Sequence, residues 1–183
     1  YKELLNKRKI IFDNIILFSI LGLLAVTIFN SALFYSLRHT QVITGLLMIS
    51  TVPVMIIFFS YLLKIEKTNL FQIIGVLLSL IGVIFIITKA DLDNLINLTF
   101  NKGDIFALIA MFAWSLYSSL LKKREYDLSP ISTLQVVITF GVIFLIPMYF
   151  IDYKLGSIIV FETNFYLVLF YVVLFPGLIS FLF

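Results

Sequence analysis

Residues 14–37 read NIILFSILGLLAVTIFNSALFYSL, and this run contains no Lys, Arg, Asp or Glu. An α-helix rises about 1.5 Å per residue, so about 20 residues cross the roughly 30 Å hydrocarbon core of a bilayer. Five more runs of this kind follow at 41–63, 68–88, 105–121, 129–151 and 163–183, separated by clusters of charge. None shows the alternation that β-barrel strands require. The sequence therefore predicts an all-α, polytopic transmembrane helix bundle with six spans.

The composition indicates that lipid is the solvent for most of the chain. Apolar residues make up 62% of it and charged residues 13%, against roughly a quarter charged in ordinary soluble domains. The net charge of +3 is spread over short loops, which argues against a nucleic-acid partner. With no Cys and one His, the chain offers no thiol chemistry, and a zinc or haem site built from protein ligands alone is not expected. We predict no catalytic residue, metal or cofactor.

The basic residues of the loops predict the orientation of the chain, because membrane proteins keep an excess of Lys and Arg in their cytoplasmic loops. One set of alternate loops holds Lys2, Lys7, Arg8, Lys9, Lys64, Lys67, Lys122, Lys123 and Arg124. The other set holds Arg38, Lys89, Lys102 and Lys154. We therefore expect residues 1–13 in the cytoplasm and residues 89–104 outside.

Small residues recur at helical spacing on two spans, where they let membrane helices approach closely. One set, on the first span, is Gly22, Ala25 and Ala32, and the other, on the third span, is Gly75, Ser79 and Gly82. We expect both sets to serve packing within the bundle.

Neutral polar residues inside the spans are the candidates for a substrate cavity. An amide or hydroxyl group in hydrocarbon needs a partner, so it turns toward other helices or a wet cavity. Ser132, Gln135 and Thr139 recur on one side of a helix, and Trp114 lies mid-span rather than at an interface. Two interpretations stay open, helix–helix hydrogen bonding and the lining of a substrate path. The candidates for the second are Asn30, Thr51, Trp114, Ser118, Gln135 and Thr139.

Two stretches carry a more specific pattern. The first contains Thr51-Val52-Pro53-Val54, then Tyr61-Leu62-Leu63-Lys64-Ile65-Glu66-Lys67, then the run from Gly75 to Gly82. The second is Gly103-Asp104-Ile105-Phe106-Ala107-Leu108, leading to Ala113-Trp114-Ser115-Leu116-Tyr117. Together they resemble the EamA-type permeases of the drug/metabolite transporter superfamily. Pro53, Glu66 and Trp114 match the proline, glutamate and tryptophan of that family.

The resemblance implies a fold larger than this chain. Members have ten helices, built as two inverted five-helix repeats around a central cavity, and the six spans look like helices three to eight. The implied organisation is a cytoplasmic loop at 1–13, the end of the first repeat at 14–88, an external inter-repeat loop at 89–104, and the start of the second repeat at 105–183, with its last helix truncated. The chain lacks a starting Met and stops inside an apolar run, so we expect missing sequence at both ends.

The resemblance also implies the function. We expect a secondary transporter of a small organic metabolite, such as an amino acid, that works by alternating access in a bacterial cytoplasmic membrane. Lipid and the small-molecule substrate are its expected partners, and a homodimer stays open. One alternative is a carrier of phosphorylated or nucleotide sugars, although no span holds the Lys or Arg that anionic cargo favours. The other is a membrane scaffold that transports nothing. We expect Glu66, beside Lys64 and Lys67, to be structural.

Overall fold

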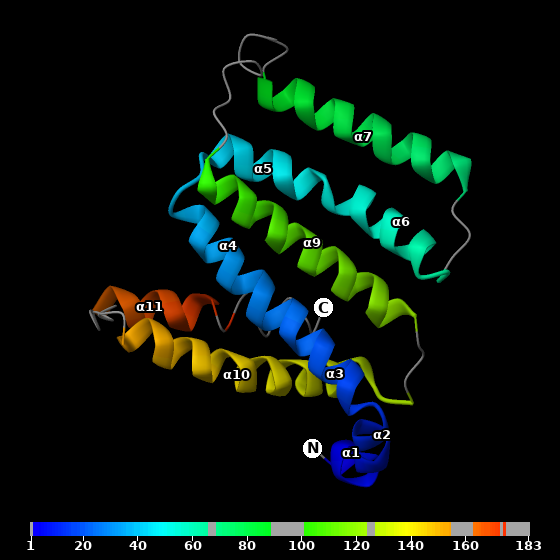
Figure 1. Ribbon diagram of the computed structural model, residues 1–183, viewed down its shortest axis with the longest axis vertical. Coiled ribbons are helices and arrows are strands. Elements are labelled where there is room, and N and C mark those ends of the chain that lie inside the picture. Colours follow the sequence, from blue (N-terminus) through cyan, green and yellow to red (C-terminus); the bar gives the residue numbers. More distant parts are fainter. Residues whose placement is uncertain are drawn as a thin grey trace. The chain divides into compact units, whose positions relative to one another are not determined.

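The computed structural model describes residues 2–65, 69–88, 101–123, 127–154, 163–172 and 174. Every element named in these ranges is a helix (Figure 1). The elements are α1 (Lys2–Asn6), α2 (Arg8–Asp13), α3 (Ile15–Gly22), η1 (Leu23–Ile28), α4 (Phe29–Leu37), α5 (Val42–Ser50), α6 (Val52–Leu62), α7 (Leu70–Thr88), α9 (Lys102–Lys122), α10 (Pro130–Lys154) and α11 (Thr163–Val172). The chain forms two compact units, Tyr1–Ile146 and Pro147–Phe183.

Four helical stretches of the described residues are long and apolar enough to cross a membrane: Ile15–Leu37, Thr44–Leu62, Lys102–Lys122 and Pro130–Ile151. They coincide with the first, second, fourth and fifth predicted spans. The third predicted span forms α7, whose apolar part Leu70–Gly82 is shorter. The sixth begins as α11, and its residues 175–183 lie outside the described part of the chain. The predicted all-α polytopic membrane fold is confirmed.

The first span is one continuous helix with a wider turn in its middle. α3, η1 and α4 follow one another without a break, and η1 is π-helical. A π-turn replaces the regular bonds between residues i and i−4, which leaves the backbone ladder irregular. The Asn30 carboxamide donates to the carbonyl oxygens of Ala25 at 3.2 Å and Val26 at 2.9 Å. Asn30 therefore supplies a donor where the ladder is irregular.

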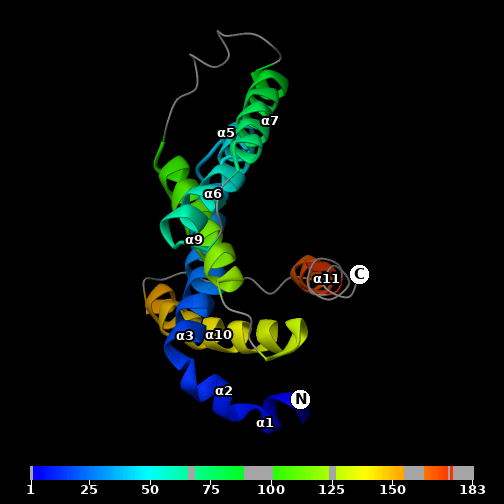
Figure 2. The ribbon, with the colours of Figure 1, turned by 90° about the vertical axis from the view of Figure 1, so that its right-hand side faces the viewer.

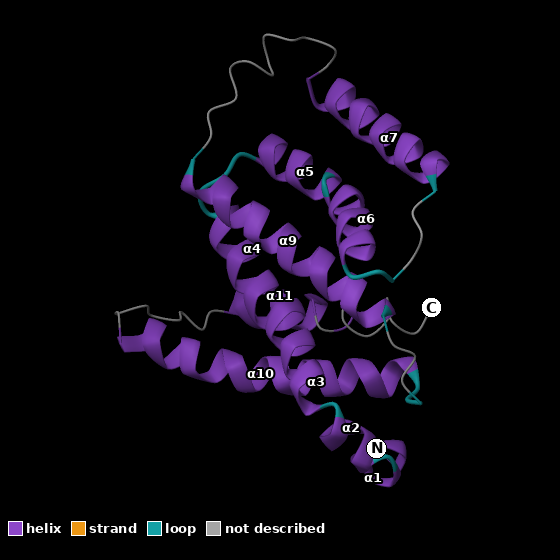
Figure 3. Cartoon of the chain, turned by 45° about the vertical axis from the view of Figure 1, so that its right-hand side comes forward, coloured by secondary structure: helices purple, strands orange, loops and turns teal. Residues whose placement is uncertain are grey.

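The second span is broken between α5 and α6, at the loop-coloured joint in Figure 3. Pro53 has no backbone N–H, so it cannot continue the helical hydrogen bonds across the joint. The hydroxyl groups of the two residues before Val52 instead donate to backbone carbonyls three residues earlier in the chain. Thr51 Oγ1 donates to the Met48 carbonyl at 2.6 Å, and Ser50 Oγ donates to the Leu47 carbonyl at 2.7 Å. The proline and the two hydroxyl groups together end α5 and restart the chain as α6.

α9 is the centre of the first unit. It lies between α4 and α6 (Figure 1), and α7 packs on the far side of α5 and α6 (Figure 2). Its buried side chains include Ala107, Ala110 and Ala113, whose small size lets the neighbouring helices approach. Ser115 and Ser119 donate to the Val52 and Ile56 carbonyls of α6, each at 3.4 Å. Because the numbers rise together in both helices, α6 and α9 run parallel.

The first half of α10 crosses the first span at two glycines. A Cβ atom added to Gly22 would lie 2.7 Å from both the Gly141 nitrogen and the Val137 carbonyl oxygen, and one added to Gly141 would overlap the Val26 side chain. Thr27 Oγ1 donates to the Gly141 carbonyl at 3.0 Å. The packing role predicted for Gly22 is therefore confirmed.

The small residues of α7 behave differently from those of the first span. Among the described residues, nothing lies within 4 Å of a Cβ atom placed on Gly75 or Gly82. The packing role that we predict for this face of the third span stays a prediction.

The second unit contains the end of α10 from Pro147 onward and α11. Tyr149 and Tyr153 stack one turn apart on α10, with ring centroids 6.4 Å apart. The large side chains of α11 from Phe165 to Tyr171 are exposed. Lipid is the solvent that suits such an apolar surface.

Candidate functional site

Asn30 and Thr51, the two candidate cavity residues of the first two spans, stand where the helices are irregular. Asn30 follows the π-helical turn, and Thr51 forms the joint between α5 and α6. Both donate to carbonyls of their own span. Within the described residues, the Asn30 Oδ1 atom accepts no hydrogen bond, so it keeps a free acceptor at membrane depth.

Trp114 and Ser118 lie together on α9. The Ser118 hydroxyl donates to the Trp114 carbonyl at 2.8 Å. The half-buried Trp114 ring contacts Phe29 of α4, with ring centroids 4.7 Å apart, and Tyr117, with ring centroids 5.4 Å apart. Phe29 directly precedes Asn30 in the sequence, so Trp114 packs against the turn of α4 that carries Asn30.

Gln135 and Thr139 lie on the exposed side of α10. The Thr139 hydroxyl donates to the Gln135 carbonyl at 2.7 Å, while the Gln135 carboxamide makes no hydrogen bond within the described part of the chain. Ser132, the third member of the predicted stripe, is instead buried and bonded to Glu3. The three residues differ in exposure because Glu3 covers only the first turn of α10, which carries Ser132.

The six candidates therefore do not form one cluster in this chain. Among the described residues, no hydrogen bond or ring contact joins Thr51, Gln135 or Thr139 to Trp114. Two hollows in the first unit have other linings. One of about 330 Å³ lies between α6, α7 and the end of α9, beside Ser60, Gln72 and Lys122, and one of about 140 Å³ lies between α4, α5 and α9. Contact of the six residues with a substrate stays a prediction.

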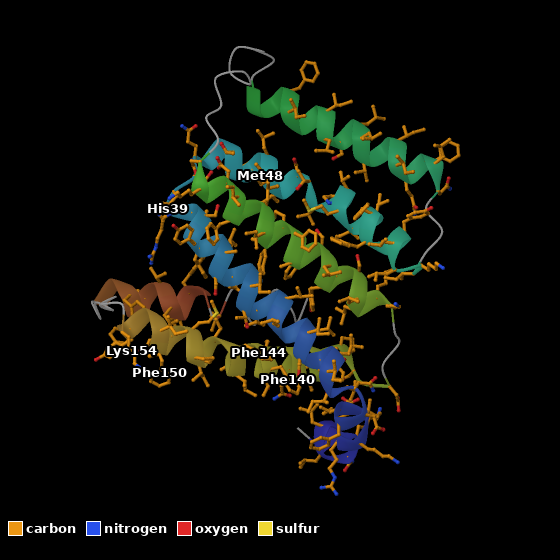
Figure 4. The ribbon with its side chains drawn as sticks, viewed as in Figure 1. His39, Met48, Phe140, Phe144, Phe150 and Lys154 are labelled. Carbon is orange, nitrogen blue, oxygen red and sulfur yellow. The ribbon has the colours of Figure 1, made fainter. Side chains whose placement is uncertain are left out.

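The turn between α4 and α5 is fixed to the start of α9 by a set of contacts that we call the turn clasp. Asn101 and Asp104 form a reciprocal cap, in which Asn101 Oδ1 accepts from the Gly103 N–H at 2.7 Å and Asp104 Oδ2 accepts from the Asn101 N–H at 2.7 Å. The Thr40 hydroxyl donates to Asp104 Oδ1. A Cβ atom on Gly103 would lie 2.8 Å from the backbone of His39, which Figure 4 labels beside the start of α9.

The N-terminal segment is fixed to the start of α10 by a second set, the N-terminal clasp. Glu3 accepts hydrogen bonds from Ser129 and Ser132, and Lys7 Nζ lies 3.0 Å from Asp127 Oδ1. The Ser129 hydroxyl, followed by the Ser132 hydroxyl and the Ser129 N–H, holds the pKa of Glu3 at about 2, below its ordinary 4.5. The hydrogen bond to Asp127 raises the pKa of Lys7.

The two clasps agree with the predicted alternation of the loops. The N-terminal clasp joins residues 1–13 to the connection before α10, two segments placed on one side by the charge pattern. The turn clasp joins the turn at residues 38–40 to the start of α9, and the charge pattern places both of these segments on the opposite side. Sequence reasoning missed both clasps, although Asn101 followed three residues later by Asp104 has the spacing of a capping box. Which side is the cytoplasm stays a prediction.

The remaining candidates from the sequence carry no site in the described residues. No group of three or more His, Asp or Glu side chains gathers there in a way that could hold a metal ion. Glu66 lies outside the described part of the chain, so its structural role stays a prediction.

The chain matches the model of the EamA-like transporter family twice, over residues 2–88 and 101–183. The chain is also similar to transporters that are themselves uncharacterized. It is 24% identical over 133 residues to the uncharacterized transporter YyaM of Bacillus subtilis (strain 168), which covers 73% of this chain and 44% of the relative.

Two further relatives have higher identity. An uncharacterized transporter of Clostridium kluyveri is 36% identical over 104 residues, 56% of this chain and 33% of the relative. One of Archaeoglobus fulgidus is 30% identical over 131 residues, 70% of this chain and 44% of the relative. The chain therefore matches less than half the length of each of these relatives. No solved structure is significantly similar to it.

Proposed function

Because the chain belongs to the EamA-like transporter family, we propose that the intact protein is a secondary transporter that carries a small organic metabolite, such as an amino acid, across a bacterial cytoplasmic membrane. The double match to the family, at 2–88 and 101–183, is the observation that carries this proposal. In the mechanism that we propose, the two matched segments belong to two inverted repeats that rock around a cavity near the midplane of the membrane. Residues 1–13 then lie in the cytoplasm.

The irregular backbone in the middle of the first two spans supports this mechanism. Transporters bind substrates where membrane helices are discontinuous, because irregular backbone is tolerated at that depth only where protein or a wet cavity surrounds it. The joint at Thr51 is such a break, and the π-helical turn of η1 is a second place of irregular backbone, within a span that stays continuous. In our proposal, Asn30 Oδ1 accepts a hydrogen bond from the cargo, and Trp114 forms a flat wall against it.

The chemistry of the spans favours neutral or zwitterionic cargo. The six predicted spans contain no Lys, Arg, Asp or Glu, so the candidates offer only neutral donors and acceptors. A phosphate or nucleotide would be better held by Arg or Lys. An amino acid has an amine that needs an acceptor such as Asn30 and a carboxylate that needs a donor such as the Gln135 carboxamide.

Flux through the intact protein in proteoliposomes tests the proposal. We expect saturable exchange of at least one labelled amino acid or related metabolite, and none of sugar phosphates. Gln135→Ala should lower that exchange about three- to tenfold, the effect of one lost hydrogen bond, without changing thermal stability. Ile138→Ala, a change at an exposed apolar position of the same helix, is the matched control and should transport normally.

Two results would speak against the proposal. If Gln135→Ala lowers stability while turnover per folded molecule stays normal, Gln135 joins helices and does not line the path. If a correctly inserted protein moves nothing in a broad metabolite panel, the membrane scaffold is the better account.

A further inference from the structure

Glu3 makes more contacts than a partly exposed carboxylate usually does. Its Oε1 atom accepts from the Ser129 N–H at 3.0 Å, and its Oε2 atom accepts from the hydroxyl groups of Ser129 at 2.6 Å and Ser132 at 2.5 Å. These donors lie at the start of α10, where backbone N–H groups lack helical partners and the helix dipole favours a negative charge. Ser129 Oγ itself accepts from the Ser132 N–H at 3.3 Å, so a carboxylate from a distant segment binds the residue that caps α10.

Lys7 fixes the same junction from the other side. Its Nζ atom donates to the Asp127 carbonyl at 2.7 Å and lies 3.5 Å from Glu3 Oε1. Arg8 and Lys9, which follow directly, are exposed and make no ion pair within the described residues. Among Lys7, Arg8 and Lys9, the pairing is therefore specific to Lys7.

The N-terminal segment also contacts the apolar core. Leu4, Ile10 and Ile11 pack against the buried cluster that contains Leu128 and Val136. Leu4, Ile10 and Ile11 therefore cover part of this cluster. Opening the N-terminal clasp would give this part of the cluster access to solvent.

α10 has a second point of attachment, at the glycine crossing. Gly141 is nine positions beyond Ser132, which is about 14 Å along a helix. The Val26 side chain fits against Gly141 there, and the Thr27 hydroxyl donates to the Gly141 carbonyl at 3.0 Å. Gln135 and Thr139 lie on the exposed side of the segment between the two attachments. α10 is therefore held at its start by polar bonds and in its middle by a close backbone contact, which is the fixed point of any movement of the helix.

We propose that the N-terminal clasp is the cytoplasmic gate of the transport path, and that α10 turns about the Gly22–Gly141 crossing when Glu3 and Lys7 release it. The gate rests on the proposed transport function. A polar clasp at the surface suits this role, because its separated groups regain hydrogen bonds from water and the difference between closed and open states stays small. The movement would free the first turn of α10, at Ser132, toward the cytoplasm and shift the exposed Gln135, which follows one turn later.

Thiol labelling tests whether the clasp opens. The chain has no cysteine, so Val136→Cys places one probe in the buried cluster under the clasp. A membrane-impermeant thiol reagent is applied to the cytoplasmic face of vesicles that hold the intact protein. Glu3→Gln should speed labelling about tenfold, because bonds to a charged group are lost. Lys7→Gln should speed it less, and the matched control Lys9→Gln should leave it unchanged.

A second probe separates opening from unfolding. Ala113→Cys lies in the same buried cluster but on α9, and its labelling should not respond to Glu3→Gln. Equal labelling at position 136 in the Glu3→Gln and Lys9→Gln proteins would overturn the gate. So would an increase at position 113 as large as that at position 136.

A reversible lock connects the clasp to transport. With Glu3→Cys and Ser132→Cys in one molecule, a reducible bifunctional thiol cross-linker should lower exchange at least about tenfold, and a reductant should restore it. Unchanged exchange in fully cross-linked protein overturns the gate and leaves the proposed function standing. If the wild-type protein exchanges nothing, the proposed function fails, and the labelling rates still decide whether the clasp opens.

Discussion

Gly22→Ala is the substitution that tests the helix packing most sharply. The new Cβ atom would lie 2.7 Å from two backbone atoms of α10, the Gly141 nitrogen and the Val137 oxygen, and neither belongs to a side chain that can rotate away. Ordinary contact begins at 3.4 Å, so the helices must separate by about 0.7 Å. A gap of that size forfeits a quarter to a half of the dispersion energy of the contacts it opens.

The same separation would break a buried hydrogen bond. The bond from Thr27 Oγ1 to the Gly141 carbonyl is 3.0 Å long, and stretching it to about 3.7 Å ends it. Overpacking costs about 1–3 kcal/mol and the lost bond about 1 kcal/mol, while replacing glycine by alanine inside a helix returns up to about 1 kcal/mol. The net expectation is a destabilisation of about 1–3 kcal/mol.

Gly75→Ala is the matched control, because nothing described lies within 4 Å of its Cβ position. It should stabilise the protein by up to about 1 kcal/mol through helix propensity alone. The free energy of unfolding of each intact protein is measured in mild detergent by titration with SDS, followed by circular dichroism. If Gly22→Ala proves as stable as Gly75→Ala, the close crossing of the first span and α10 is wrong.

Three further predictions follow from the clasps. Asp104→Asn weakens the turn clasp, because the cap of α9 and the bond from Thr40 both use the carboxylate; the same titration should show a loss of about 1–3 kcal/mol, and wild-type stability would contradict it. The lowered pKa of Glu3 means that its contribution is complete above about pH 4.5 and is lost as the pH falls toward 2; the free energy of unfolding from the same titration should fall more over that range in wild type than in Glu3→Gln, and equal losses would contradict it. Single cysteines at positions 39 and 123 should react with an impermeant reagent from outside and from inside, respectively, and the opposite pattern would reverse the topology.

The membrane-spanning segments could be predicted from the sequence because a charged side chain in the hydrocarbon core costs a large free energy. Charged residues lie at both ends of the first five apolar runs, and the helices Lys102–Lys122 and Pro130–Ile151 begin and end close to the predicted limits. Local caps were also predictable, since they depend on residues three apart. Gln72 Oε1 accepts from the Asn69 N–H at 3.1 Å, as the pattern of that helix start indicates.

Irregular helices were predictable only where proline marks them. Pro53 signals the break in the second span. Nothing signals η1, because Leu23 to Ile28 are residues that an ordinary membrane helix also contains. Asn30 is the only residue whose type is consistent with an irregular turn at this place. Its amide is equally consistent with a hydrogen bond to another helix, so the sequence does not distinguish the two.

The clasps could not be predicted from one sequence, because each joins residues far apart in the chain. Glu3 and Ser129 are brought together by the fold of everything between them. The same reason explains the divided polar stripe of α10. Helical spacing fixes the face on which Ser132 and Gln135 lie, but the partner that covers a face comes from another segment.

Two-sided access to one residue is the most direct test of alternating access. Thr139 is nine residues into Pro130–Ile151, close to its middle, and is exposed in the described chain. In the intact protein, Thr139→Cys should react with an impermeant thiol reagent added from the cytoplasmic side and, in a separate experiment, from the outer side. The transported metabolite should slow both reactions. Labelling from one side only, or from neither, with no effect of any metabolite, would contradict the account.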